Sequence, residues 1–209
     1  MEFLGIDLTS SPERPSAFAI LDEKPCLTSH GSFATDKELL ELAARRKPAL
    51  IAIDAPLGLP WGLHCLEDNC VCEPLLDYAG RAAEQMLARR GIGCFFTTKR
   101  SIIKAMVYRG IRLSKLLARQ GHTVIEVYPY ATRRILFGDV QPRKQTAAGL
   151  AFLQQRLTPR VQGVDGLEMN HDLGDALLAS FTAHLHHRGQ TETLGIPEEG
   201  CIVIPWTGR

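Results

Sequence analysis

FLGIDLTSS, residues 3–11, is an apolar strand with a charge inside it, and it is the most informative stretch of the chain. Residues 2–8 have the composition of a β-strand, and Asp7 precedes small, turn-forming residues. A carboxylate within a buried strand is costly unless a partner compensates its charge. Asp7 is therefore either a hydrogen-bonded structural acid or a site residue that binds a cation.

The segments that follow are typical of an α/β protein. Short turns join residues 2–8 to predicted strands at 16–21 and 26–34, which indicates an antiparallel meander. TDKELLELAARRK (35–47) combines a threonine cap with apolar residues at helical spacing, so it predicts a helix. ALIAID (49–54) is a continuous apolar run of the kind found in buried parallel strands.

The second half of the chain is predicted to be mostly helical. One further strand, HTVIEVYP, carries an acid in its middle, and the last helix, NHDLGDALLASFTAHLHHRG, is the clearest in the sequence. The predicted helices span 75–90, 101–120, 130–137, 145–157 and 170–189, and the strand spans 122–129. Together these elements predict a mixed five-stranded sheet, three antiparallel strands followed by parallel ones, flanked by helices.

Composition favours one globular domain over residues 1–209, with a cysteine- and arginine-rich insertion at 61–120. The chain is 45% hydrophobic and 22% charged, and no apolar run approaches the length of about 20 residues that crosses a bilayer. Its six cysteines are clustered, which suits reduced thiols or a metal in the cytoplasm better than a secreted disulfide framework. The sequence does not indicate an oligomeric state.

Four aspartates stand where the predicted elements can bring them together. Asp7 and Asp54 lie near the ends of two strands, and Asp172 and Asp175 lie one turn apart on the last helix. Four converging carboxylates repel one another unless cations neutralise them, and an oxygen-only ligand set suits Mg²⁺ or Mn²⁺. Two such ions can catalyse phosphodiester cleavage. Alternatively, Asp172 stabilises the helix N-terminus, and Asp54 caps the following turn.

Residues 81–119 carry ten basic side chains and a single acid, Glu84. This surplus of positive charge predicts a surface that contacts the phosphate backbone of a nucleic acid. A solvated helical face is the alternative interpretation. The residues assigned to nucleic-acid binding are Arg81, Arg89, Arg90, Lys99, Arg100 and Lys104.

The segment HCLEDNCVC holds an imidazole and three thiols within nine residues, His64, Cys65, Cys70 and Cys72. These four side chains can supply a tetrahedral zinc site, and Cys94 is a further candidate ligand. The spacing C-x₄-C-x-C is not that of a standard zinc knuckle. Free cysteines or a redox pair are the alternative explanations.

The order of these segments resembles the ribonuclease H-like superfamily, and DLGDALLASFTAH resembles the acidic helix of RuvC-type junction resolvases. Over most of its length the chain resembles the domain-of-unknown-function family 429, a family of predicted nucleases. The matching pieces are FLGIDLTSS, AIDAPLGLP, RAAEQMLARRGIG, VIEVYP and HDLGDALLAS.

The resemblance implies a ribonuclease H-like fold and a metal-dependent nuclease that acts on DNA or RNA. It matches Asp7, Asp54, Asp172 and Asp175 to the family's acids and adds Glu126 as a residue at the rim of the site. Two other functions stay open. One is an actin-like or sugar-kinase-related phosphotransferase or nucleotide-binding protein, although a single copy of the core and the lack of a P-loop argue against it. The other is an inactive nucleic-acid-binding module, which the full set of acids disfavours.

Overall fold

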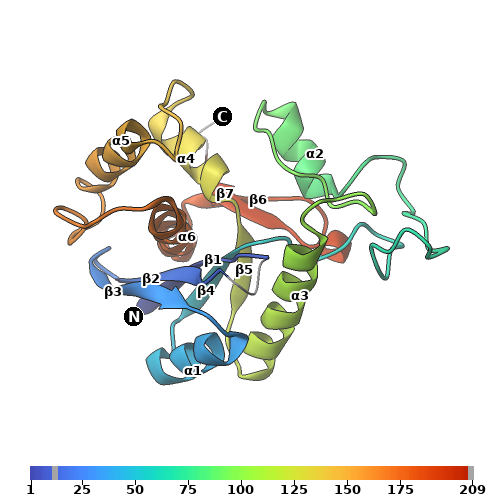
Figure 1. Cartoon of the computed structure of the whole chain (residues 1–209), viewed down its shortest axis with the longest axis horizontal. Coiled ribbons are helices and arrows are strands. Elements are labelled where there is room, and N and C mark those ends of the chain that lie inside the picture. Colours follow the sequence, from blue (N-terminus) through green and yellow to red (C-terminus); the bar gives the residue numbers. More distant parts are fainter. Residues whose placement is uncertain (11–13, 207–209) are drawn as a thin grey trace.

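A mixed β-sheet forms the centre of the protein, and helices cover both of its faces (Figure 1). The computed structural model describes residues 1–10 and 14–206; part of the turn predicted after Asp7 lies outside the described residues. The strands are β1 (Glu2–Asp7), β2 (Ser16–Asp22), β3 (Leu27–Phe33), β4 (Leu50–Asp54), β5 (Val124–Val127), β6 (Thr191–Leu194) and β7 (Ile202–Pro205). The α-helices are α1 (Asp36–Arg46), α2 (Ala82–Arg89), α3 (Lys104–Arg119), α4 (Pro129–Phe137), α5 (Ala147–Leu157) and α6 (His171–His187).

The strand order within the described residues is β3-β2-β1-β4-β5-β7-β6. Strands β1, β2 and β3 form the predicted antiparallel meander. Strands β4, β5 and β7 continue the sheet in parallel with β1, and β6 closes it as an antiparallel edge. The parallel pairing of β1 with β4 puts their carboxyl ends at the same edge, with Asp7 directly opposite Asp54.

Alternate residues of β1 serve two different cores. Leu4 and Ile6 pack toward α1 and α3 on one face of the sheet. Phe3 packs on the other face, in a cluster that includes Ala179 of α6. Because side chains alternate along a strand, Asp7 points to the same face as Phe3, which is the face covered by α6.

Gly5 allows α6 to lie directly against β1. A Cβ atom at Gly5 would stand 2.1 Å from the backbone nitrogen of Ser180 and 2.2 Å from the carbonyl oxygen of Ala176. The hydroxyl of Ser180 donates a 2.7 Å hydrogen bond to the carbonyl of Phe3, which fixes the contact. Any larger residue at position 5 would push away the helix that carries Asp175.

The fold class is confirmed, but the sheet has seven strands in the described residues rather than the predicted five. The two additional strands, β6 and β7, contain four residues each and extend the sheet beyond β5. The helix predicted at 75–90 begins only at Ala82, because Gly80 adopts a φ of +73°, outside the helical region.

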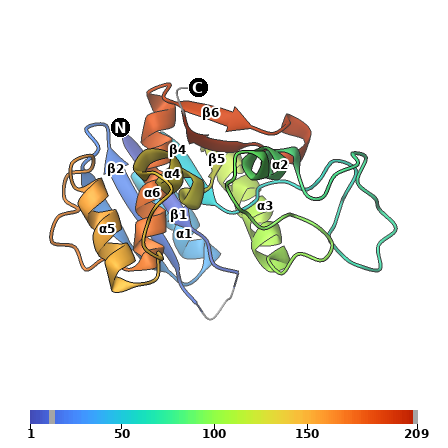
Figure 2. The same cartoon turned by 90° about the horizontal axis from the view of Figure 1, so that it is seen from above.

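The connection from β4 to β5 contains the predicted insertion at 61–120. Its first part extends away from the sheet as an irregular segment, whereas α3 returns and packs against the sheet (Figures 1 and 2). Leu113 and Leu117 of α3 are fully buried in the core shared with β1 and β4. None of the helices in the described part of the chain is long and apolar enough to span a membrane.

Candidate active site

Three aspartates that are far apart in sequence converge at the carboxyl end of β1 and β4. Asp7 and Asp54 face each other across the two strands, and Asp175 reaches them from the second turn of α6. One carboxylate oxygen from each residue lies within 4.8 Å of the others. Asp175 is only 7% exposed, so little water is available to screen the repulsion among the three groups.

The electrostatics of this acid cluster (Asp7, Asp54 and Asp175) are unfavourable without a cation. Burial, followed by the charges of Asp54, Asp175 and Asp172, raises the pKa of Asp7 to about 9. Burial and the charge of Asp175 raise the pKa of Asp54 well above its usual range. The acid cluster therefore retains protons at neutral pH unless positive charge replaces them.

Lys144, in the loop between α4 and α5, supplies one positive charge. Its ammonium donates a 2.5 Å hydrogen bond to Oδ2 of Asp175. Burial lowers the pKa of Lys144, but the charge and hydrogen bond of Asp175 outweigh this effect, and the net result is a raised pKa. Sequence reasoning missed Lys144 because nothing in the sequence near it indicates a site.

Asp172 lies at the rim of the acid cluster. It is a neighbour of Asp7 and contributes to the raised pKa of that residue, but it is not one of the three mutually close acids. Its carboxylate lies 2.6 Å from Nδ1 of His171 and is 42% exposed. The cap of α6 is provided by Asn170, whose side chain accepts a hydrogen bond from the Leu173 N–H.

One protein family matches nearly the whole length of the chain. The family described as "Protein of unknown function (DUF429)" matches residues 5–200. The chain belongs to this family. No functionally curated protein matches the DUF429 chain in sequence.

Two solved structures of RuvC from Thermus thermophilus are similar to the DUF429 chain. The first, "Thermus thermophilus RuvC structure", is 13% identical, covers 90% of this chain and 97% of its own, and gives a TM-score of 0.51. The second, RuvC in complex with a Holliday junction substrate, is 13% identical, covers 90% and 96%, and gives a TM-score of 0.47. The first likeness shows that the DUF429 chain has the ribonuclease H-like fold.

The structure does not bring Glu126 into the acid cluster. Its carboxylate accepts two hydrogen bonds from the guanidinium of Arg81, at 2.6 and 2.8 Å, and a third from the Leu57 N–H. That third bond caps the turn after β4, a role that the sequence also allowed for Asp54. In the described structure Glu126 therefore holds the scaffold of the DUF429 chain together.

Arg81 is a correction to the predicted nucleic-acid surface. Its side chain is 1% exposed and forms ion pairs with Glu84 and Glu126, so no phosphate can reach it. Glu84 also accepts hydrogen bonds from the backbone and hydroxyl of Thr97. These four side chains form a buried scaffold network (Arg81, Glu84, Thr97 and Glu126).

The folded protein has less uncompensated positive charge on this surface than the sequence of residues 81–119 indicates, because acids from other segments neutralise part of it. Arg90 pairs with Glu192 and Lys104 with Asp68. Lys99 donates from its ammonium to the carbonyl oxygen of Cys70. In the described part of the chain, two exposed residues of the predicted set form no ion pair, namely Arg89 and Arg100.

The structure also gathers the predicted zinc ligands. His64, Cys65, Cys70 and Cys72 each place a donor atom within 4.8 Å of the others. Cys94 is not part of this group, because its thiol donates to the carbonyl oxygen of Glu84 and belongs to the α2 side of the molecule.

The cavity next to the acid cluster is much smaller than the cavity on the insertion. The cavity that touches Asp54 measures about 70 Å³ and is lined largely by apolar side chains, including Phe95 and Met106. A larger hollow of about 500 Å³ lies on the insertion, between Pro60 and Lys99, and none of the four aspartates lines it. The acid cluster is therefore not enclosed in a pocket the size of a small-molecule site, which is about 300–1,000 Å³.

Proposed function

We propose that this DUF429 protein is a metal-dependent nuclease that hydrolyses phosphodiester bonds in nucleic acid. The observation that carries the proposal is the approach of three carboxylates, from β1, β4 and α6, to within 4.8 Å of one another. In the described structure Lys144 forms an ion pair with Asp175, and further positive charge has to replace the protons that Asp7 and Asp54 otherwise retain. Such a site favours divalent cations.

The donor set fits hard cations. Asp7, Asp54 and Asp175, with Asp172 at the rim, offer only oxygen ligands, and we assign them two Mg²⁺ or Mn²⁺ ions. Two such ions supply an activated water and stabilise the charge on the attacking and leaving oxygens of a phosphodiester. The chain's own residues hold the ligand oxygens in place, because Gly5 seats α6 on β1 and the parallel register sets Asp7 opposite Asp54.

Arg89 and Arg100 are the best-supported contacts to the phosphate backbone, because their side chains are exposed and unpaired within the described residues. Arg90, Lys99 and Lys104 can add to this surface only by exchanging their present partners for phosphate. The resemblance of the last helix to that of RuvC-type resolvases supports nucleic acid as the substrate. All six cysteines are free thiols, which supports a reducing compartment such as the cytoplasm.

A phosphotransferase is the weaker candidate. A nucleotide would need an enclosed site next to the acids, and the cavity that touches Asp54 measures only about 70 Å³. A binding module without catalysis is disfavoured for a different reason. Acids near the phosphates would weaken the binding of nucleic acid if they held no cation.

The test is a cleavage assay on a four-way DNA junction, duplex DNA, single-stranded DNA and RNA, with Mg²⁺, with Mn²⁺ and with a chelator. Wild type should cleave at least one substrate only with a divalent ion. Asp7→Asn should lower the rate about 100-fold or more, because losing a charged ligand costs several kcal/mol of transition-state stabilisation.

Asp165→Asn is the matched control, because Asp165 is an exposed acid outside the acid cluster. It should cleave at the wild-type rate. Cleavage that survives in Asp7→Asn, or that is equally fast with a chelator, would contradict the proposal. ATP binding by wild type without any cleavage would favour the phosphotransferase.

A further inference from the structure

The first part of the insertion, residues 61–77, needs something other than a hydrophobic core to hold it. It contains neither helix nor strand, and Leu66 is its only buried residue. Val71 is 94% exposed and Leu75 is 67% exposed. Irregular segments of this length are uncommon in compact domains, and chains that cannot bury enough apolar surface are usually held by disulfides or metals.

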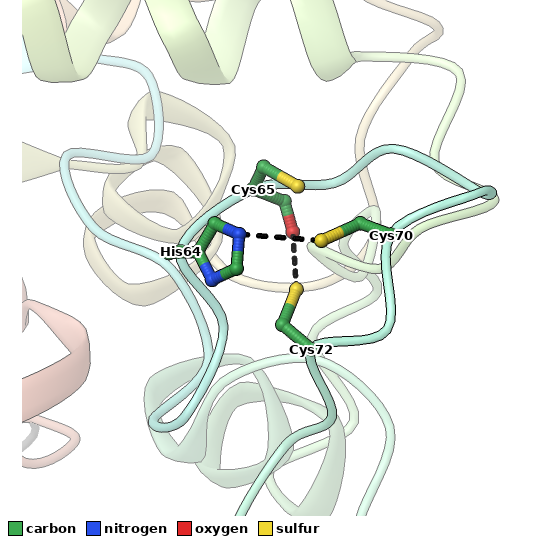
Figure 3. A group of neighbouring side chains, drawn as sticks. All are labelled: His64, Cys65, Cys70 and Cys72. Atoms are coloured by element: carbon green, nitrogen blue, oxygen red, sulfur yellow. Dashed lines mark hydrogen bonds between the residues drawn. The ribbon is translucent and has the colours of Figure 1, made fainter.

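Four soft donors gather at one point of this segment. The Cys₃His group consists of His64, Cys65, Cys70 and Cys72, and its donor atoms all lie within 4.8 Å of one another (Figure 3). Nε2 of His64 lies 3.2 Å from Sγ of Cys70. In tetrahedral zinc coordination with Zn–S bonds of about 2.3 Å, neighbouring donors stand about 3.5–3.8 Å apart, so small shifts suffice to bind one ion.

We propose that the Cys₃His group binds one structural zinc ion, which holds residues 61–77 in their fold. Three thiolates and one imidazole are a standard donor set for structural zinc. Because the protein supplies all four ligands, no coordination position is left for a water or a substrate, as is typical of a structural site. A disulfide would use two of the three thiols and would leave the imidazole of His64 without a role. Hard cations are disfavoured, because they prefer oxygen ligands.

The surroundings of the Cys₃His group suit a metal centre with net negative charge. Three thiolates and Zn²⁺ leave one negative charge, and the ammonium of Lys99 lies next to it on the carbonyl of Cys70. The hydroxyl of Tyr108, on α3, accepts a 2.6 Å hydrogen bond from the Leu66 N–H and donates to Glu67. These contacts connect residues 61–77 to α3 and to Lys99, which lines the large hollow on the insertion.

The test is the metal content of the full-length chain, purified under reducing conditions after growth with zinc and measured by mass spectrometry. Wild type should hold one zinc ion per chain, and Cys70→Ser should lose it. Cys26→Ser is the matched control, because Cys26 is a free cysteine outside the Cys₃His group. Asp7→Asn should keep its zinc, which separates this site from the acid cluster and makes the outcome independent of cleavage.

A second measurement covers the case in which Cys70→Ser does not fold. Co²⁺ added to the metal-stripped wild type should give the intense visible bands of tetrahedral coordination and a near-ultraviolet sulfur-to-cobalt transition. The proposal is overturned if reconstituted wild type holds no zinc, or if Cys70→Ser holds as much as Cys26→Ser. It is also overturned if the chain purified without reductant and then denatured has fewer than six titratable thiols, because a disulfide would then replace the metal.

Discussion

The acid cluster and the scaffold network both place carboxylates on the neighbouring strands β4 and β5, yet only the carboxylate of the scaffold network has a full complement of partners. Glu126 on β5 accepts hydrogen bonds from both terminal nitrogens of Arg81 and is 4% exposed. Asp54 on β4 lies within 4.8 Å of the carboxylate oxygens of two other aspartates, and the charge of Lys144 only partly offsets the rise in its pKa. The fold explains a buried acid with an arginine partner, whereas the acid cluster is accounted for by the cations that we propose.

The direction of each side chain accounts for the difference. Glu126 is in register with Ile53, which packs toward α1 and α3. Asp54, one residue later, points to the other face, where α6 brings Asp175. Because successive residues of a strand alternate between faces, a shift of one position separates a residue of the proposed site from a residue of the scaffold network.

The difference between the acid cluster and the scaffold network is tested most strongly by neutralising one carboxylate in each. Asp54→Asn should lower cleavage about 100-fold or more, since it removes a charged ligand from the proposed metal site. Glu126→Gln should keep cleavage close to that of wild type at temperatures where it is folded, because the carboxylate is absent from the acid cluster. Parallel cleavage assays and thermal melts measure both effects. A Glu126→Gln variant that is folded but inactive would assign Glu126 to the site after all.

Arg81→Met should lower the free energy of unfolding by about 3–5 kcal/mol, because it leaves two acids buried without their counter-ion. Arg89→Met is the matched control on the same segment. Arg89 is exposed, so its replacement should change stability by no more than about 0.5 kcal/mol. Urea unfolding monitored by circular dichroism measures both variants. Equal stabilities would mean that the scaffold network contributes little beyond what packing provides.

The acid cluster should also make the metal-free protein sensitive to pH. Burial and the neighbouring acids raise the pKa of Asp7 from its ordinary 3.8 to about 9 in the folded chain, so the folded state binds an extra proton between these limits. Stability from this group is complete below about pH 4 and is lost as the pH rises toward about 9, by at most about 1.4 kcal/mol per pH unit.

The measurement is urea unfolding of wild type and Asp7→Asn in the presence of a chelator, at several pH values. The difference between the two chains removes the contributions of acids that do not interact with Asp7, and wild type should lose stability relative to the variant as the pH rises. Mn²⁺ should reduce this loss in wild type, since a bound cation replaces the protons. A difference that does not change with pH would contradict the raised pKa of Asp7.

Much of the fold follows from local patterns that a single sequence displays. The meander, the buried strand that ends at Asp54 and the last helix were all predicted, because each is long enough to show its period. The convergence of Asp7, Asp54 and Asp175 was also expected, since charged residues at the ends of apolar elements are costly without a purpose. Strands β6 and β7, of four residues each, were not predicted.

Residue type and local order are written in the chain, and they are enough to indicate a ribonuclease H-like fold with acids at its strand ends. The ion-pair partners of charged side chains cannot be predicted from the sequence, because an ion pair joins residues that only the folded backbone brings together. The sequence predicts Arg81 to be part of a basic surface, but folding pairs it with Glu126, 45 residues away, and removes both from solvent. Lys144 likewise binds Asp175, 31 residues away, because only the tertiary structure brings the loop between α4 and α5 next to α6.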